Sequence, residues 1–318
     1  MTDKPIAVII DTDPGSDDTY AFYLANASRV LDIKAITSVA GTMTGERTYK
    51  NASEINEYLK IGANVARGAD GPLCIEQKLG SFLHGENGLG NLVLPAVVKT
   101  EQPEKAWDTI YNTAVQCGKI TVIAIGPLTN IAIAYLRYPD LPNYVDKIIM
   151  MGGSADYGNR TSYAEFNIWA DPHAAQIVFG SGMDIYMLGL NVTNKSAIPF
   201  EDMARLNDLG GFAGADVEKL FCHYYDYFRQ MNIEGIVIHD AVAVAAAIDE
   251  SLITYKSAWV GAEYTSTINM GRTVTAFDIK APNVHVGIEI DMKKYLVLLE
   301  NMMKYYAEMT GDDACEHR

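Results

Sequence analysis

The sequence contains few cysteines and has no excess of positive charge. Its 318 residues include 4 cysteines, which lie far apart and form no CxxC pair. This spacing indicates neither a zinc knuckle nor a disulfide framework, so we expect a reducing, cytoplasmic environment. Lys and Arg number 25 against 40 Asp and Glu, which gives a formal net charge of −15. A chain this acidic repels phosphate backbones, and we expect no nucleic-acid partner.

Long apolar runs are missing as well. The most apolar tract, residues 241–248, is far shorter than the roughly 20 uninterrupted residues of a membrane-spanning helix. The N-terminal segment has one short apolar run that meets acidic residues at once, without the basic segment and cleavage site of a secretory signal. We therefore expect a soluble protein that has no membrane partner.

What the sequence does contain is an alternation of short apolar segments and longer helical patterns. Strands are predicted over residues 6–10, 33–39, 120–125, 147–151 and 184–193, and helices over 17–27, 49–59, 128–138 and 171–182. Later segments predict helices over 224–231, 240–248 and 292–306, with short alternating stretches at 273–279 and 285–290. This order predicts an α/β fold, an open and mostly parallel sheet flanked by helices on both faces. No linker or repeat divides the chain, so we expect a single domain over residues 1–318.

Four carboxylates crowd the turn after the first predicted strand: Asp11, Asp13, Asp17 and Asp18. Ligands of open α/β sheets bind at the carboxyl ends of the strands, so the turn lies where a site is expected. Capping of the following helix could explain Asp17 or Asp18 individually, but not all four carboxylates. Their mutual repulsion favours a bound cation, and an all-oxygen ligand set favours calcium or magnesium over zinc.

The same turn carries a family resemblance. DTDPGSDD at residues 11–18 resembles the signature of the nucleoside hydrolase family, the inosine-uridine preferring nucleoside N-ribohydrolases. Further segments resemble blocks of that family in the same order, at residues 84–90, 126–132, 151–153, 158–175 and 238–244. The resemblance implies calcium-dependent hydrolysis of the N-glycosidic bond of ribonucleosides to ribose and free base. It also implies a role in nucleoside salvage and a homodimer or homotetramer.

The resemblance assigns a metal site and a general base. It implies that Asp13 is both the base that accepts a proton from water and a metal ligand. Asp18, Asp240 and the backbone carbonyl of Ile125 would be the other ligands to Ca²⁺. Because a carbonyl ligand does not depend on its side chain, isoleucine is acceptable at position 125. The resemblance also implies that Asp11 lies behind these ligands and orients them.

A second group of residues would hold the ribose. Asp17 fits the 2′ side, because a carboxylate that accepts bonds from the ribose diol is left unpaired by 2′-deoxy substrates. Asn159, Glu165 and Asn167 resemble the set that holds the 3′ and 5′ hydroxyls, and Phe166 lies among them. Without the resemblance, these residues would be interpreted as an ordinary polar loop.

Two histidines are further candidates. A lone histidine before a helix is more often a surface residue. His239 directly precedes Asp240, however, and the resemblance implies that it donates a proton to the leaving base. His84 lies in a glycine-rich loop, HGENGLG at residues 84–90. It could close over the ribose or base, or be a structural histidine of the loop, and the sequence leaves both readings open.

The region that would contact the base is less well defined. Thr42 occupies a substrate-binding position at which the family usually has asparagine, which affects the expected substrate range. A later helix carries the aromatic residues Tyr224, Tyr225, Tyr227 and Phe228. Because an aromatic stripe at helical spacing is usually core, we expect one or two of them to reach the pocket. The sequence does not predict which base is preferred.

Two alternatives remain. A magnesium-dependent phosphatase of the haloacid dehalogenase type also begins with a strand followed by DxD, but its turn normally continues Gly-Thr, whereas Pro14 and Gly15 follow here. The other alternative is a non-catalytic, calcium-dependent nucleoside-binding protein, which would not need Asp13 as a base.

Overall fold

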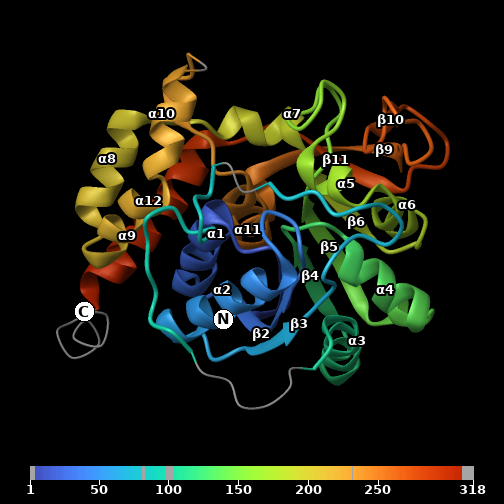
Figure 1. Cartoon of the computed structure of the whole chain (residues 1–318), viewed down its shortest axis with the longest axis horizontal. Helices are drawn as coiled ribbons and strands as arrows, with labels where there is room; N and C mark the ends of the chain where they lie inside the picture. The colour runs from blue at the N-terminus through green and yellow to red at the C-terminus, as the bar shows by residue number, and fades with distance from the viewer. Residues whose placement is uncertain (1–3, 81–82, 98–103, 231, 310–318) are drawn as a thin grey trace.

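The fold is built around one large sheet. The computed structural model describes residues 4–80, 83–97, 104–230 and 232–309. Within them, nine strands form a central sheet, covered by helices on both faces (Figure 1), in the order β10-β9-β11-β6-β5-β4-β1-β2-β3. Their bounds are β1 Ile6–Thr12, β2 Leu31–Ser38, β3 Asn64–Arg67, β4 Ile120–Ala124, β5 Val145–Met151, β6 Ile185–Leu188, β9 Ile253–Ala262, β10 Thr273–Phe277 and β11 Val284–Ile290. In the order of the sheet, the seven neighbouring strands β11, β6, β5, β4, β1, β2 and β3 pair in parallel. At the other edge, β9 pairs antiparallel with both β11 and β10, and the mostly parallel sheet confirms the predicted fold class.

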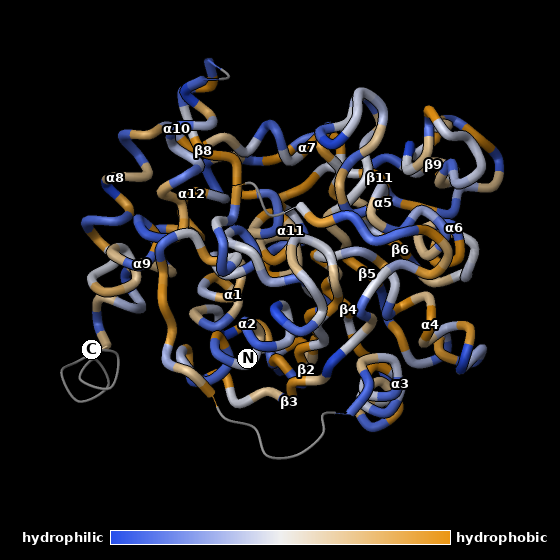
Figure 2. The backbone as a smooth tube through the Cα atoms, in the orientation of Figure 1, coloured by the Kyte–Doolittle hydropathy of each residue, from blue (hydrophilic) through white to orange (hydrophobic). Residues whose placement is uncertain are grey.

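The helices form two layers with separate cores. Their bounds are α1 Ser16–Ala27, α2 Gly45–Tyr58, α3 Ala106–Cys117, α4 Thr129–Arg137, α5 Phe166–Ala170, α6 Pro172–Phe179, α7 Leu190–Thr193, α8 Phe200–Leu209, α9 Phe212–Leu220, α10 Cys222–Gln230, α11 His239–Ile248 and α12 Met292–Glu308. Because strand side chains alternate in direction, Val8 and Ile10 pack with α1, α2, α11 and α12, whereas Ile9 packs with α3, α4 and α6. Figure 2 shows hydrophobic residues concentrated in central strands such as β2 and β4.

The strand order reverses at β1. The chain proceeds from β1 to β2 and β3 on one side, and returns to β4, β5 and β6 on the other. In open α/β sheets, such a switch point leaves a crevice at the carboxyl ends of the two strands. Asp11 is near the end of β1 and Ile125 follows β4, and the Ile125 N–H donates to the Asp11 carbonyl at 2.8 Å. The acidic turn therefore begins at the switch point.

The sequence prediction differs from the structure at several elements. The strand predicted over residues 184–193 ends at Leu188, and its last residues form the short helix α7. There the chain leaves the sheet, and the Leu190 N–H donates to the Gly153 carbonyl at 2.9 Å. The long strand β9 was not predicted, because exposed and buried residues do not alternate regularly along it. A small sheet of β7 (Ile198–Pro199) and β8 (Gly235–Ile236) was missed as well.

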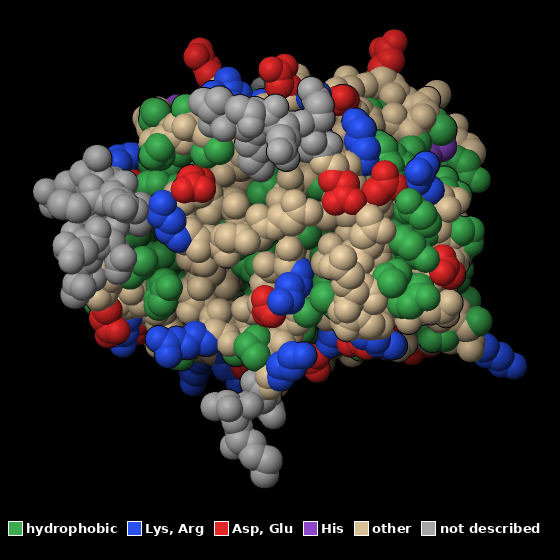
Figure 3. All heavy atoms as spheres, turned by 90° about the horizontal axis from the view of Figure 1, so that it is seen from below, with side chains coloured by type: hydrophobic (Ala, Val, Ile, Leu, Met, Phe, Trp, Pro, Cys, Tyr) green, Lys and Arg blue, Asp and Glu red, His purple; other side chains and the backbone are tan. Residues whose placement is uncertain are grey.

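Charged side chains of both signs are mixed on the surface shown in Figure 3. On the face shown in Figure 3, Lys and Arg side chains lie among Asp and Glu side chains, without a field of one sign. Among the described residues, no helix is both long enough and apolar enough to cross a membrane.

Candidate active site

Three carboxylates meet where two helices begin. Asp17 and Asp18 lie in the first turn of α1, and Asp240 lies in the first turn of α11. The two helices pack against each other, and one carboxylate oxygen of each residue lies within 4.8 Å of the others. We call these three residues the acidic cluster. Asp17, Asp18 and Asp240, which the sequence assigned to one site, are thus brought together.

Asp18 is held by the turn that precedes its helix. The Thr12 hydroxyl donates to Asp18 Oδ1 at 2.5 Å, and the Gly15 N–H donates to Oδ2 at 2.9 Å. Burial, followed by the charge of Asp17, raises the pKa of Asp18 to about 6. Both oxygens are therefore fixed in direction before any ligand binds.

Asp13 lies at the base of the turn and is 2% exposed. The Thr42 N–H donates to Asp13 Oδ2 at 2.6 Å, and the Thr42 hydroxyl donates to the Asp13 carbonyl at 2.5 Å. A Cβ at Gly41 would lie 2.2 Å from Oδ2, and one at Gly126 would lie 2.8 Å from Oδ1, so only glycine permits this approach. Burial and the nearby Asp18 charge raise the pKa of Asp13 well above its usual value. Its Oδ1 accepts no hydrogen bond from the described residues.

Asp11 lies behind the turn. Its Oδ1 accepts from the Thr37 hydroxyl at 2.5 Å and from Asn130 Nδ2 at 2.8 Å. Burial raises the pKa of Asp11 to about 7. Asn130 also donates to the Ser38 carbonyl at 3.0 Å, which ties the end of β2 to the same group. Asn130 was not predicted as a site residue, although it lies inside the GPLTNIA block at residues 126–132.

The chemistry of these groups fits a hard cation. Among the described residues, no Lys or Arg side chain forms an ion pair with Asp13 or with any member of the acidic cluster. Burial raises the pKa of Asp17 and of Asp240, and the repulsion between them raises that of Asp240 further. A divalent cation would offset this desolvation and repulsion, and carboxylate and carbonyl oxygens are the ligands that Ca²⁺ and Mg²⁺ prefer. The residues present therefore fit a bound metal ion.

Asn167 lies in the first turn of α5 and Glu165 is its N-cap residue, and both contact the ends of the central strands. Asn167 Nδ2 donates to the Ile125 and Met151 carbonyls, each at 3.1 Å, which joins the ends of β4 and β5. Its Oδ1 has no hydrogen-bond partner within the described residues. Glu165 caps α5 by accepting from the Asn167 N–H at 2.8 Å and the Ile168 N–H at 3.2 Å, and it also accepts from the Gly153 N–H after β5 at 2.8 Å. Burial raises its pKa to about 7. The Ile125 carbonyl thus has a neighbour that fixes its direction.

Asn159 and Phe166 are more exposed to solvent than Glu165 and Asn167. Asn159 is exposed, and its Oδ1 accepts the Phe166 N–H at 3.0 Å. A Cβ at Gly80 would lie 2.7 Å from the Phe166 ring, so the ring packs directly on that loop. Asn159 therefore supports the start of α5, and its amide nitrogen has no partner in the described part of the chain.

His239 is the first residue of α11 and is partly exposed. Its Nδ1 lies 2.7 Å from the Thr193 hydroxyl of α7. Desolvation lowers the pKa of His239 to about 4, so the ring is neutral at pH 7. Thr193 was not predicted as a site residue, because its segment has the apolar pattern of a strand, whereas it ends α7.

His84 and Tyr224 contact the acidic cluster from two other segments. His84 Nδ1 accepts the Ser16 N–H at 3.0 Å and lies 3.7 Å from Asp17 Oδ1. Burial lowers the pKa of His84 to about 4, so this contact is not an ion pair. Burial and the nearby Asp17 charge raise the pKa of Tyr224 of α10. Its ring stands edge-on to His84 with centroids 5.9 Å apart. Of the four aromatic residues left open by the sequence, Tyr224 reaches the cluster, and Phe228 packs behind it.

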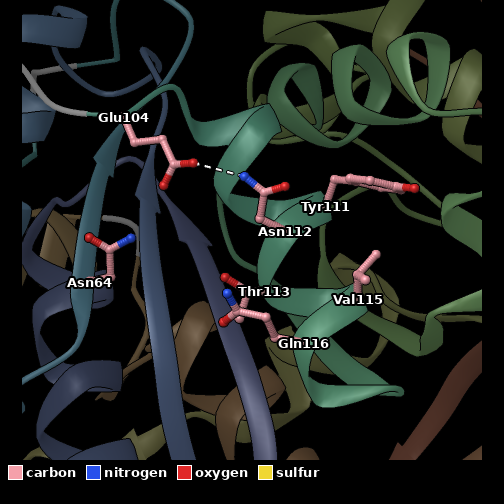
Figure 4. Close-up of a pocket in the computed structure, with 7 residues that line it drawn as sticks. All are labelled: Asn64, Glu104, Tyr111, Asn112, Thr113, Val115 and Gln116. Atoms are coloured by element: carbon pink, nitrogen blue, oxygen red, sulfur yellow. Dashed lines mark hydrogen bonds between the residues drawn. The ribbon is translucent and has the colours of Figure 1, made fainter.

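A separate polar depression lies beside α3 and β3 (Figure 4). Its lining includes Glu104 and Asn112, which are joined by a hydrogen bond of 2.9 Å from Asn112 Nδ2, and Asn64 at the start of β3. None of its lining residues belongs to the acidic cluster or to the predicted site.

A largely buried carboxylate cluster lies at the switch point of an open α/β sheet, beside amide and carboxylate acceptors. This is the arrangement expected of a site that binds a cation and a small polar molecule. Comparison with known proteins gives the family. The profile described as "Inosine-uridine preferring nucleoside hydrolase" matches residues 8–297. The chain belongs to this family of N-glycosyl hydrolases, which confirms the resemblance seen in its motifs.

Individual relatives agree with this assignment. The chain is 35% identical over 309 residues to the pyrimidine-specific ribonucleoside hydrolase RihA of Salmonella paratyphi C, with 95% of this chain and 99% of the relative covered. Among solved structures, it resembles the plant nucleoside hydrolase PpNRh1, with a TM-score of 0.87 and 31% identity over 95% of this chain and 99% of that one. It also resembles the purine-preferring ribonucleoside hydrolase from Gardnerella vaginalis, with a TM-score of 0.89 and 27% identity over 96% of this chain and 100% of that one.

Proposed function

We propose that the protein is a calcium-dependent, cytoplasmic nucleoside N-ribohydrolase that converts a ribonucleoside and water to ribose and free base for nucleoside salvage. The observation that carries the proposal is the acidic cluster with Asp13 beside it at the switch point. The proposed ligands to Ca²⁺ are Asp13, Asp18, Asp240 and the Ile125 carbonyl. Bound there, Ca²⁺ would lower the pKa of a ligating water and bind ribose hydroxyls.

Asp13 is the proposed general base. Its Oδ2 is occupied by the Thr42 N–H, whereas Oδ1 accepts no hydrogen bond from the described residues. This free Oδ1 can accept a proton from water as the water attacks the anomeric carbon. Asp11, held by Thr37 and Asn130, supports the strand end that carries this base.

The ribose would be held by acceptors with free lone pairs. Asp17 is the proposed partner of the 2′-hydroxyl, and Tyr224 lies near its charge. Asn167 presents its Oδ1, because its amide nitrogen is already bonded to two backbone carbonyls. Glu165 and Asn159 are the proposed partners of the remaining hydroxyls. Both already bond to backbone N–H groups that set their positions.

The leaving base requires a proton. His239 is the proposed donor, and its Nδ1 contact with Thr193 leaves Nε2 for the base. Because its pKa is lowered to about 4, the small protonated fraction is a strong acid, which would pass its proton to the departing base and return to the neutral ring. The identity of 35% to a relative named pyrimidine-specific favours uridine and cytidine as the first substrates to test. A homodimer or homotetramer, and one domain over the whole chain, complete the proposal.

The test is a reducing-sugar assay over a panel of purine and pyrimidine ribonucleosides, with calcium present. Release of ribose and free base supports the proposal. Binding of ribonucleosides without turnover would instead favour the calcium-dependent binding protein. Release of phosphate from phosphate monoesters without nucleoside cleavage would favour the phosphatase.

A further inference from the structure

The helix that carries Asp17 and Asp18 is capped by a residue from another part of the chain. Gly15 is the N-cap of α1 and has no side chain to bond to the first free N–H groups. His84 supplies the missing acceptor, because its Nδ1 lies 3.0 Å from the Ser16 nitrogen. Both residues are buried, His84 at 8% and Ser16 at 0% exposure. The imidazole therefore does the work of an N-cap side chain.

The imidazole packs directly on Gly15. A Cβ at this position would lie 2.6 Å from His84 Nδ1 and 2.9 Å from Cε1. The φ of Gly15 is −106°, which any residue can adopt, so close approach and not backbone conformation requires glycine here. Since Nδ1 accepts a hydrogen bond, the ring proton of the neutral histidine lies on Nε2.

The loop that carries His84 is itself attached to the acidic turn. Asn51 Nδ2 donates to the Pro14 and Asn87 carbonyls, each at 3.0 Å, so one amide joins the turn to the loop. The Gly90 N–H donates to the His84 carbonyl at 2.8 Å and closes the loop. His84 is thus held in place from two sides, independently of any substrate.

We propose that His84 is a positioning residue, which holds Asp18 in place for the metal ion and Asp17 in place for the ribose by capping α1 through Nδ1. The inference rests on the proposed function for the identity of the cation, but the cap is a property of this chain alone. It resolves the two readings of His84 that the sequence left open in favour of a structural use of Nδ1.

Three substitutions distinguish the role of Nδ1 from that of Nε2. In His84→Asn the amide oxygen can take the place of Nδ1, in His84→Gln the amide reaches the place of Nε2, and His84→Ala removes both. Calcium affinity, measured by titration calorimetry, should stay within about twofold in His84→Asn and weaken by about five- to tenfold in the other two, the factor expected for one lost cap. His173→Gln is the matched control, because His173 lies on α6 beside Tyr264 and makes no contact with the acidic turn. It should leave calcium affinity unchanged.

A second variant breaks the same contact without changing the histidine. Gly15→Ala places a methyl group where the ring now lies, and should weaken calcium binding as much as His84→Gln does. In the His84→Ala background the space is free, so Gly15→Ala should have no further effect. This dependence on the histidine distinguishes the cap from a general disturbance of the turn.

Amide hydrogen exchange of residues 15–20 in metal-free protein gives a readout that requires neither calcium nor substrate. Exchange should be faster in His84→Gln and Gly15→Ala than in wild type and His84→Asn. Retained calcium affinity in His84→Gln, equal losses in His84→Asn and His84→Gln, or unchanged exchange in all variants would overturn the inference. A wild-type protein that binds no calcium would contradict the proposed function, while the exchange pattern would still decide the role of His84.

Discussion

Thr42 holds Asp13 at two points, by its N–H to Oδ2 at 2.6 Å and by its hydroxyl to the Asp13 carbonyl at 2.5 Å. The hydroxyl proton is thus already bonded to the protein and is not available to the ribose. At this position, where the resemblance implied asparagine, threonine holds the proposed base. This contact leads to the first prediction.

Thr42→Val should lower kcat by about tenfold and change KM little, because valine keeps the N–H bond to Oδ2 and loses only the hydroxyl bond that fixes the Asp13 backbone. Thr42→Ser should restore most of the rate. Steady-state kinetics on uridine measures both, with Thr48→Val as the control. Thr48 is also buried and donates to a backbone carbonyl, but within α2. A large rise in KM with kcat preserved would instead indicate that Thr42 contacts the substrate.

Asp13→Asn and Asp240→Asn should both abolish turnover, but for different reasons. Asp240 belongs to the acidic cluster, so its loss should weaken calcium binding most. Asp13→Asn removes the base, and its amide oxygen can still approach the cation, so calcium binding should persist in part. Metal analysis and calorimetry beside the rate assay separate the two effects. Near-normal activity in either variant would contradict the assignment of the site.

Substrates without the 2′-hydroxyl should react at least about tenfold more slowly than ribonucleosides. Asp17 would lose a hydrogen-bond donor while remaining largely shielded from water, which costs roughly 1–3 kcal/mol. The measurement compares kcat/KM for uridine and 2′-deoxyuridine. Equal values would show that Asp17 does not hold the diol.

His239→Ala should slow inosine cleavage by about 10²–10⁴-fold, the range of general acid catalysis, because a natural base leaves poorly as an anion. The p-nitrophenyl riboside should slow far less, since its leaving group needs no proton. Equal slowing of both substrates would indicate that His239 positions the ribose or the metal. Calcium content must be measured alongside, because His239 adjoins Asp240.

The sequence predicted the parts of the site that are contiguous in the chain. Asp13, Asp17 and Asp18 follow one strand within one turn, so strand and helix geometry alone places them together. It could not predict contacts that depend on packing between distant elements. Asn130 reaches Asp11 across 119 residues, and Thr193 reaches His239 across 46 residues from a segment that had been predicted as a strand. The hydrogen bond between His84 and the start of α1 could not be predicted for the same reason. Nothing in the sequence of a glycine-rich loop indicates which helix the loop will contact.

The most direct test of the account is ribonucleoside cleavage by purified protein before and after removal of calcium with a chelator. The account predicts about one bound calcium per chain. It also predicts equal amounts of ribose and free base as products, loss of turnover on chelation, and recovery when calcium is restored. Turnover that persists in the calcium-free protein, or tight ribonucleoside binding without any cleavage, would contradict it.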